Sequence, residues 1–293
     1  MSIKLAWQQM GSGPDVILIH GLASSRAFWY SNLAQRLKSH YRITLFDLRG
    51  HGYSEAPREG YSSAAMAGDL LALMQQAGIH HAHLIGHSYG GSVAAEFAQQ
   101  HPERCLSLAM MDSRLMQLQT TQYLHDVPHI SEFERQAAEH TGRDWSSEPQ
   151  IGFSFLEALA RLRAGGWSPE AIDGFTPFGE GHSGIRAARQ FTRLLDETTA
   201  ASDFLTPGAT PEALAAMQLP TLLLYGGLSR CLQTGHALAQ LWPHAEYREL
   251  EDARHFFPIT HAEQVGRALT QWLTQGIARQ RVRLPGEPAT RAA

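Results

Sequence analysis

Short apolar runs alternate with helical spacing through the first 112 residues of the chain. Buried strands are predicted where the apolar residues are continuous, at 16–20, 42–46, 82–85 and 106–111. Between them, apolar residues recur every three to four positions, at about 27–37, 63–77 and 88–100. Strands that alternate with helices in this way predict an α/β fold, with a mostly parallel sheet covered by helices on both faces.

The pattern changes in the middle of the chain and then returns. Helical stretches at 131–140, 153–163 and 184–198 follow one another without a strand-like run, separated by glycine and proline. Strand-like runs resume at 220–225 and 246–250, followed by an amphipathic helix at about 262–273. We therefore expect a core of residues 1–113 and 218–278 and a helical cap inserted at 114–217. The Arg-, Pro- and Gly-rich segment 279–293 is expected to be a disordered tail.

Composition narrows the choice of partners. The 293 residues are 43% hydrophobic, enough for a sizeable core, and only 18% are charged, with a formal net charge of -4. No basic stripe or polybasic patch is present, so the expected ligand is a small molecule rather than nucleic acid or a membrane. No window approaches about 18 uninterrupted apolar residues and the start lacks a leader pattern, which favours a cytoplasmic protein. The oligomeric state is left open.

Cysteine and histidine give little reason to expect a metal. Cys105 and Cys231 are too few and too far apart for a disulfide framework, and we expect both to be reduced and structural. His80, His81 and His83 are close together, but they lead into an apolar strand without carboxylate or thiolate ligands. A strand start is the better interpretation, and no metal or cofactor is expected.

Reactive chemistry is indicated at Ser88. A serine hydroxyl is a poor nucleophile at neutral pH and needs a base and oxyanion donors before it can carry out acyl transfer. Gly86-His87-Ser88-Tyr89-Gly90 fits the pattern G-x-S-x-G between an apolar strand and a helix, and continues into Gly91. In that context small residues let a strained serine project above the sheet edge. The alternative is a glycine turn without a catalytic role.

Oxyanion donors are predicted next to this serine. His20-Gly21-Leu22 directly follows the first buried strand, so a loop there can fold over the same sheet edge. The backbone N–H groups of Leu22 and Tyr89 would form the oxyanion hole, each contributing about 10²–10³ in rate. The alternative is an ordinary turn that ends a strand.

With these pieces in place, the chain resembles the α/β-hydrolase superfamily, and in particular its capped, esterase-like members. The resemblance rests on His20-Gly21, Asp47-Leu48-Arg49-Gly50-His51-Gly52-Tyr53-Ser54, the turn at Ser88 and Arg254-His255-Phe256. It covers residues from about 14 to 275, interrupted by the cap. The resemblance implies that Asp47, Arg49 and His51 shape a turn near the site.

The resemblance also implies that His255 is the base, because the family order is serine, acid, histidine. His261 and His244 are its rivals. The segment departs from the family pattern at Arg254, where Gly or Cys is common, and at Thr260, where Glu is common.

The acid is where the sequence differs most from the family. Its usual position is Ser229 here, and no carboxylate occurs between Gly226 and Leu241. Asp112 is the best candidate, because it ends the strand after the nucleophile helix, 24 residues beyond Ser88 (112 minus 88). Certain haloalkane dehalogenases and cofactor-free dioxygenases of this fold take their acid from that strand end. Asp112 as a loop anchor, Asp252 or Glu251 as the acid, and a diad without an acid remain alternatives.

The cap supplies aromatic residues that could form either an apolar pocket or only the cap's own core. They are Trp145, Phe153, Phe155, Trp167, Phe175 and Phe178. His182 is expected on a flexible loop, where it is either solvated or turned toward substrate.

Three functions follow as hypotheses. The first is a serine hydrolase of a carboxylic ester, thioester or related acyl compound. The second keeps the site but uses His255 as a base without a covalent adduct, as in cofactor-free dioxygenases or C–C bond hydrolases. The third is a non-catalytic ligand-binding protein. Haloalkane dehalogenation is excluded, since it uses a carboxylate nucleophile where this chain has Ser88.

Overall fold

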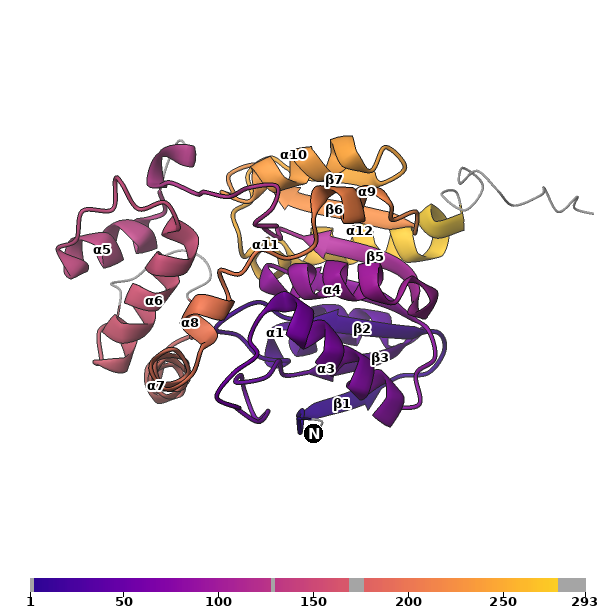
Figure 1. The fold of residues 1–293 in the computed structure, drawn as a ribbon, viewed down its shortest axis with the longest axis horizontal. Helices are drawn as coiled ribbons and strands as arrows, with labels where there is room; N and C mark the ends of the chain where they lie inside the picture. Colours follow the sequence, from indigo (N-terminus) through magenta and orange to yellow (C-terminus); the bar gives the residue numbers. More distant parts are fainter. Residues whose placement is uncertain (1–2, 128–129, 169–176, 279–293) are drawn as a thin grey trace, which may run out of the picture.

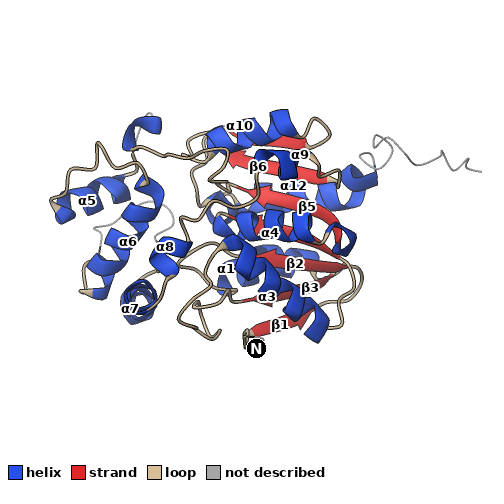
Figure 2. Ribbon diagram, in the orientation of Figure 1, coloured by secondary structure: helices blue, strands red, loops and turns tan. Residues whose placement is uncertain are grey.

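The computed structural model describes residues 3–127, 130–168 and 177–278. Its centre is a seven-stranded sheet in the order β1-β3-β2-β4-β5-β6-β7 (Figures 1 and 2). Only β1 runs antiparallel to its neighbour, and all other pairs are parallel. The strands are β1 (Trp7–Met10), β2 (Asp15–Ile19), β3 (Arg42–Phe46), β4 (Ala82–His87), β5 (Cys105–Met111), β6 (Thr221–Gly226) and β7 (Glu246–Leu250).

The central strands are apolar on both faces because helices cover both sides of the sheet. Successive residues of a strand point to opposite faces, so Ile17 and Ile19 join one core while Val16 and Leu18 join the other. One core is closed by α3 (Ser63–Gln76), α4 (Tyr89–Gln100) and α10 (Leu232–Leu241). The other is closed by α1 (Ala27–Trp29), a π-helical turn (Tyr30–Ala34), α2 (Gln35–Leu37), α12 (Ala262–Gln271) and a second π-helical turn (Trp272–Gly276).

A group of helices between β5 and β6 lies to one side of the sheet, beyond the carboxyl ends of the strands (Figure 1). These helices are α5 (Glu132–Thr141), α6 (Ile151–Ala164), α7 (Gly181–Glu197) and α8 (Ala200–Asp203), with α9 (Pro211–Ala215) leading back to the core. They have a small core of their own, made of Ala137, Trp145, Ile151, Phe155 and Leu159. The predicted α/β fold with a helical insertion is confirmed, whereas the exact domain limits stay a prediction.

Some elements differ from the expectation. The edge strand β1 and helix α10 were not expected, and β1 is short and half polar. Helix α7 begins at Gly181, so His182 lies exposed in a first helical turn; the expected loop at His182 was wrong. Phe175 and the tail 279–293 lie outside the described residues. No helix in the described ranges is long and apolar enough to cross a membrane.

Candidate active site

Ser88 occupies the turn between β4 and α4. Its backbone has φ 55° and ψ -127°, a conformation that residues other than glycine rarely adopt. Close packing on both sides of the turn holds it. A Cβ at Gly90 would lie 2.3 Å from the carbonyl oxygen of Ile19, and one at Gly86 would lie 2.4 Å from that of Gly90. The turn therefore requires glycine at both positions of the pattern around Ser88.

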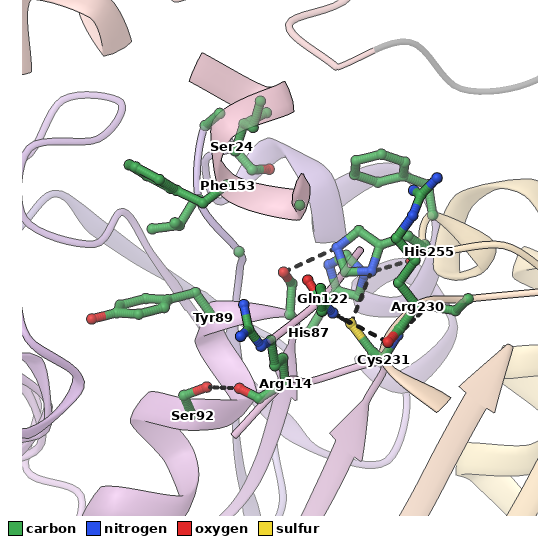
Figure 3. A pocket seen from close by; sticks show the side chains of 18 of the residues that line it. Ser24, His87, Tyr89, Ser92, Arg114, Gln122, Phe153, Arg230, Cys231 and His255 are labelled. Carbon is green, nitrogen blue, oxygen red and sulfur yellow. Dashed lines mark hydrogen bonds between the residues drawn. The ribbon is translucent and has the colours of Figure 1, made fainter. Parts of the chain in front are cut away.

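Ser88, His255 and Asp112 are brought together although 143 residues separate the last two. His255 Nε2 lies 3.0 Å from Ser88 Oγ, and His255 Nδ1 lies 2.7 Å from Asp112 Oδ2. Figure 3 shows His255 beside Cys231 at the pocket. His255 follows β7 and precedes α11 (Phe257–Thr260), while Asp112 directly follows β5. In this arrangement Nδ1–H donates to the carboxylate, which leaves Nε2 free to accept the serine proton.

Asp112 is fully buried and positioned by two further donors. The backbone N–H of Gly226 donates to its Oδ1 at 3.0 Å, and the Ser229 hydroxyl donates to its Oδ2. Its backbone φ of 47° turns the side chain at the strand end. Ser229, which stands where the family usually has its acid, thus supports the carboxylate that contacts His255.

In the described structure, the other candidates for acid and base make no hydrogen bond to Ser88 or His255, although Asp252 and His261 border the same cavity. Glu251 and Asp252 are exposed, and neither bonds His255. Thr260 Oγ1 lies 2.9 Å from Nδ1 of His261. His244 precedes β7, away from the carboxyl ends of the strands where Ser88 lies.

The surroundings of His255 stabilise its protonated, charged form. Burial, the largest single influence, lowers its pKa. The hydrogen bond to Asp112 and the contact with Cys231 together outweigh burial, so the pKa of His255 lies above its ordinary value of 6.5. Cys231 Sγ lies 3.9 Å from Nδ1, which makes this cysteine part of the site rather than only a structural residue. Both cysteines are free, in line with the expected absence of a disulfide.

Three side chains at Ser88 also lie close enough together to be considered as metal ligands. In the part of the chain that is described, one group of His, Cys and acidic side chains has ligand atoms within 4.8 Å of one another, namely Asp112, Cys231 and His255. The Asp112 and His255 atoms already bond each other, and Asp112 Oδ2 also accepts from Ser229. The group is therefore fully explained as a hydrogen-bonded triad with a neighbouring thiol.

His87 is a site residue that the sequence did not single out. Its ring stacks on Phe28 at 4.9 Å, and its Nε2–H donates to the carbonyl oxygen of His255 at 2.8 Å. Burial holds the pKa of His87 well below 6.5, so it is neutral and fixes the loop that carries His255. Its position beside Ser88 in G-x-S-x-G was the available signal.

The loop at residues 20–22 lies directly over Ser88. A Cβ at Gly21 would lie 2.8 Å from Ser88 Cβ and 3.3 Å from its Oγ. His20 is buried, its pKa lowered to about 3 chiefly by burial, and its neutral Nε2 accepts the Leu48 N–H at 3.0 Å. In the described residues, the N–H groups of Leu22 and Tyr89 donate to no backbone or side-chain acceptor. Two unused donors are thus available next to the nucleophile.

Residues 47–54 are held by hydrogen bonds and ion pairs to other segments of the chain. Asp47 accepts the N–H groups of Arg26 at 2.7 Å and Tyr53 at 2.9 Å, and pairs with the Arg26 guanidinium. Arg49 forms a bidentate pair with Asp69, both contacts at 2.6 Å. These contacts are those of turn-shaping residues.

A cavity of about 480 Å³ opens above Ser88 between sheet and cap. Phe153, Phe155 and Phe178 border it, together with Phe204, which was not among the expected aromatics. Trp145 instead packs on Phe155 inside the cap core, with ring centroids 5.5 Å apart. Trp167 contacts His140 at the same distance. The cap aromatics therefore divide between pocket and cap core.

The comparisons with known proteins agree with this architecture. The family model for the alpha/beta hydrolase fold matches residues 14–262, and the chain belongs to that family. A fluoroacetate dehalogenase from Burkholderia sp is 31% identical over 175 residues, which cover 57% of this chain and 55% of the relative. A pimeloyl-[acyl-carrier protein] methyl ester esterase from Aeromonas salmonicida is 40% identical over 115 residues, 39% of this chain and 42% of the relative.

Among solved structures, a thermophilic esterase from Thermogutta terrifontis superposes with a TM-score of 0.65. It is 24% identical, and the match covers 94% of each chain. That likeness shows the fold. The matches to these two curated relatives span 55% and 42% of the relatives' own lengths, less than two thirds in each case.

Proposed function

We propose that this chain is a serine hydrolase that cleaves a small carboxylic ester, thioester or related acyl compound through an acyl-enzyme. The observation that carries the proposal is the unbroken hydrogen-bond chain from Ser88 through His255 to Asp112, beneath two unused backbone N–H donors. The cavity of about 480 Å³ above Ser88 suits a small-molecule substrate.

Each group then has one role in the reaction. Ser88 Oγ attacks the acyl carbon while its proton passes to Nε2 of His255. Asp112 orients the ring and stabilises the imidazolium, and the N–H groups of Leu22 and Tyr89 bind the oxyanion. His255 returns the proton to the leaving alcohol or thiol. Water, activated by His255, then attacks the acyl-enzyme and releases the acid.

A fluorophosphonate probe and p-nitrophenyl butyrate test the proposal together. The wild-type protein is expected to be labelled on Ser88, and Ser88→Ala to lose labelling and about 10³-fold or more in kcat. Ser92→Ala is the matched control, because Ser92 borders the same cavity one helical turn further along α4. Failure of the folded wild-type protein to be labelled, or labelling that persists in Ser88→Ala, would contradict the proposal.

The same variant separates the alternatives. A His255 base acting without an adduct predicts that Ser88→Ala retains turnover of the natural substrate while His255→Ala loses it. A ligand-binding protein predicts no ester hydrolysis that depends on either residue.

A further inference from the structure

Three arginines border the cavity and have no part in the proposed hydrolysis: Arg254, which directly precedes His255, and the two residues Arg114 and Arg230. Arg114 follows Asp112 by two residues, and Arg230 lies between Ser229 and Cys231. The Arg114 carbonyl accepts the Ser92 hydroxyl at 2.9 Å, which places its backbone against the helix that begins at the nucleophile. Figure 3 shows Arg114 and Arg230 on the wall that also holds Cys231 and His255.

Arg114 is a cation held only by neutral groups. Its Nε, Nη2 and Nη1 donate to Gln119 O at 2.9 Å, Thr120 O at 2.8 Å and Gln150 Oε1 at 2.7 Å. In the described part of the chain no carboxylate bonds it. Burial lowers its pKa, and the opposing influence of Cys231 and Asp126, which raises it, is smaller. One N–H remains on each terminal nitrogen, so the guanidinium can still donate to a ligand in the cavity.

Arg230 adds a second positive charge that one carboxylate offsets. Its Nη1 donates to Glu134 Oε1 at 2.5 Å, whereas Nε and Nη2 are buried without a partner in the described structure. Glu134 is further held by Ser131. The two guanidinium groups have one carboxylate in direct contact, Glu134, while Asp126 acts on Arg114 without a direct contact, so the wall formed by Arg114 and Arg230 keeps an excess positive charge in its direct contacts.

The remaining acidic residues of the cavity do not offset this charge by a direct contact. Glu132 bonds the exposed Arg135, and Asp252 is exposed. Glu96 lies on α4 about 10 Å beyond Tyr89, at a rise of about 1.5 Å per residue. An anion bound at Arg114 would therefore meet a cation that no carboxylate contacts directly in the described structure, in the same cavity as Ser88.

We propose that the Arg114–Arg230 wall binds a carboxylate of the substrate, so that the substrate is an ester or thioester that also carries a carboxylate, such as the monoester of a dicarboxylic acid. This inference rests on the proposed hydrolase function and names its substrate class. Arg114 is the residue that specifies it, because its guanidinium borders the cavity and its three hydrogen bonds in the described structure all go to neutral acceptors.

A matched pair of substrates tests the proposal. Mono-p-nitrophenyl adipate and p-nitrophenyl hexanoate have acyl chains of equal length and differ in a terminal carboxylate against a methyl group. The wild-type protein is expected to prefer the adipate ester. Arg114→Gln should lose about 10- to 100-fold in kcat/KM for the adipate ester, mainly through KM, and keep its activity on the hexanoate ester. Arg114→Lys should lose less, and Arg135→Gln, an exposed control on α5, nothing.

The outcomes separate the substrate class from the hydrolase function. Equal activity of the wild-type protein on both esters, or an equal loss on both in Arg114→Gln, overturns the carboxylate site while leaving the hydrolase intact. If neither ester is cleaved and Ser88 is not labelled, the hydrolase proposal fails. Calorimetry with monomethyl adipate on Ser88→Ala then decides the site alone. Binding that Arg114→Gln abolishes supports the site, and no binding overturns it.

Discussion

Replacing Asp112 by Asn isolates the role of the acid, because the structure tolerates the new side chain. Asn adopts the positive φ region more readily than most residues, so the backbone at φ 47° can persist. The Gly226 N–H holds Oδ1 at 3.0 Å, which directs the Asn amide NH₂ to the place of Oδ2. There it would face the Ser229 hydroxyl and Nδ1 of His255 as a donor.

A donor facing Nδ1 forces His255 into the other tautomer, with the proton on Nε2 aimed at Ser88. The base then cannot accept the serine proton, and kcat is expected to fall about 10⁴-fold, equivalent to about 5.5 kcal/mol in the activation barrier. Hydrolysis of p-nitrophenyl butyrate measures the loss, and thermal unfolding verifies that the variant is folded. Asp252→Asn is the control. Retention of activity within about tenfold in Asp112→Asn, or an equal loss in Asp252→Asn, would refute the assignment.

Two further predictions concern pH and packing. A base works only when neutral, and the pKa of His255 is raised above 6.5, so kcat/KM should decline as pH falls through a value above 6.5. Cys231→Ala removes one of the contacts that raise this pKa, so the decline should occur at lower pH in the variant. An unchanged pH profile would contradict the role of Cys231. Gly90→Ala places a Cβ 2.3 Å from the Ile19 carbonyl and should lower the free energy of unfolding by about 1–3 kcal/mol in urea titrations, whereas Gly68→Ala, with open space around it in α3, should not lower it.

The core of the fold could be predicted because its strands are buried on both faces. Short, continuous apolar runs such as 16–20 and 106–111 are typical of strands inside a helix-covered sheet. β1 escaped prediction because a short edge strand with Gln8 and Gln9 has no such pattern. Its position depends on pairing with β3, which is a tertiary property.

Some residues of the candidate site could likewise be predicted from the local sequence, and others could not. Ser88 is marked locally by glycines that close packing requires, and Asp112 by its place at the end of a buried strand. Cys231 and Arg114 have no such local mark, and His87 has only its place beside Ser88 in G-x-S-x-G. Their positions follow from contacts between distant segments: His87 with the His255 carbonyl 168 residues away, and Cys231 with the ring of His255. Spacing along one sequence cannot reveal such contacts.

The position of the acid has a simple geometric explanation. β5 and β6 are parallel neighbours, so their carboxyl ends open on the same edge of the sheet, and a carboxylate after either strand can reach His255. The Asp112 N–H donates to Leu224 O at 2.9 Å, and Gly226 N–H donates back to its side chain, so the end of β6 still orients the acid. A carboxylate at both 112 and 229 would place two negative charges in contact in a buried space, at a large cost. The hydroxyl of Ser229 avoids that repulsion and supplies a donor, so a serine at the usual acid position is compatible with the proposed Ser88-His255-Asp112 triad.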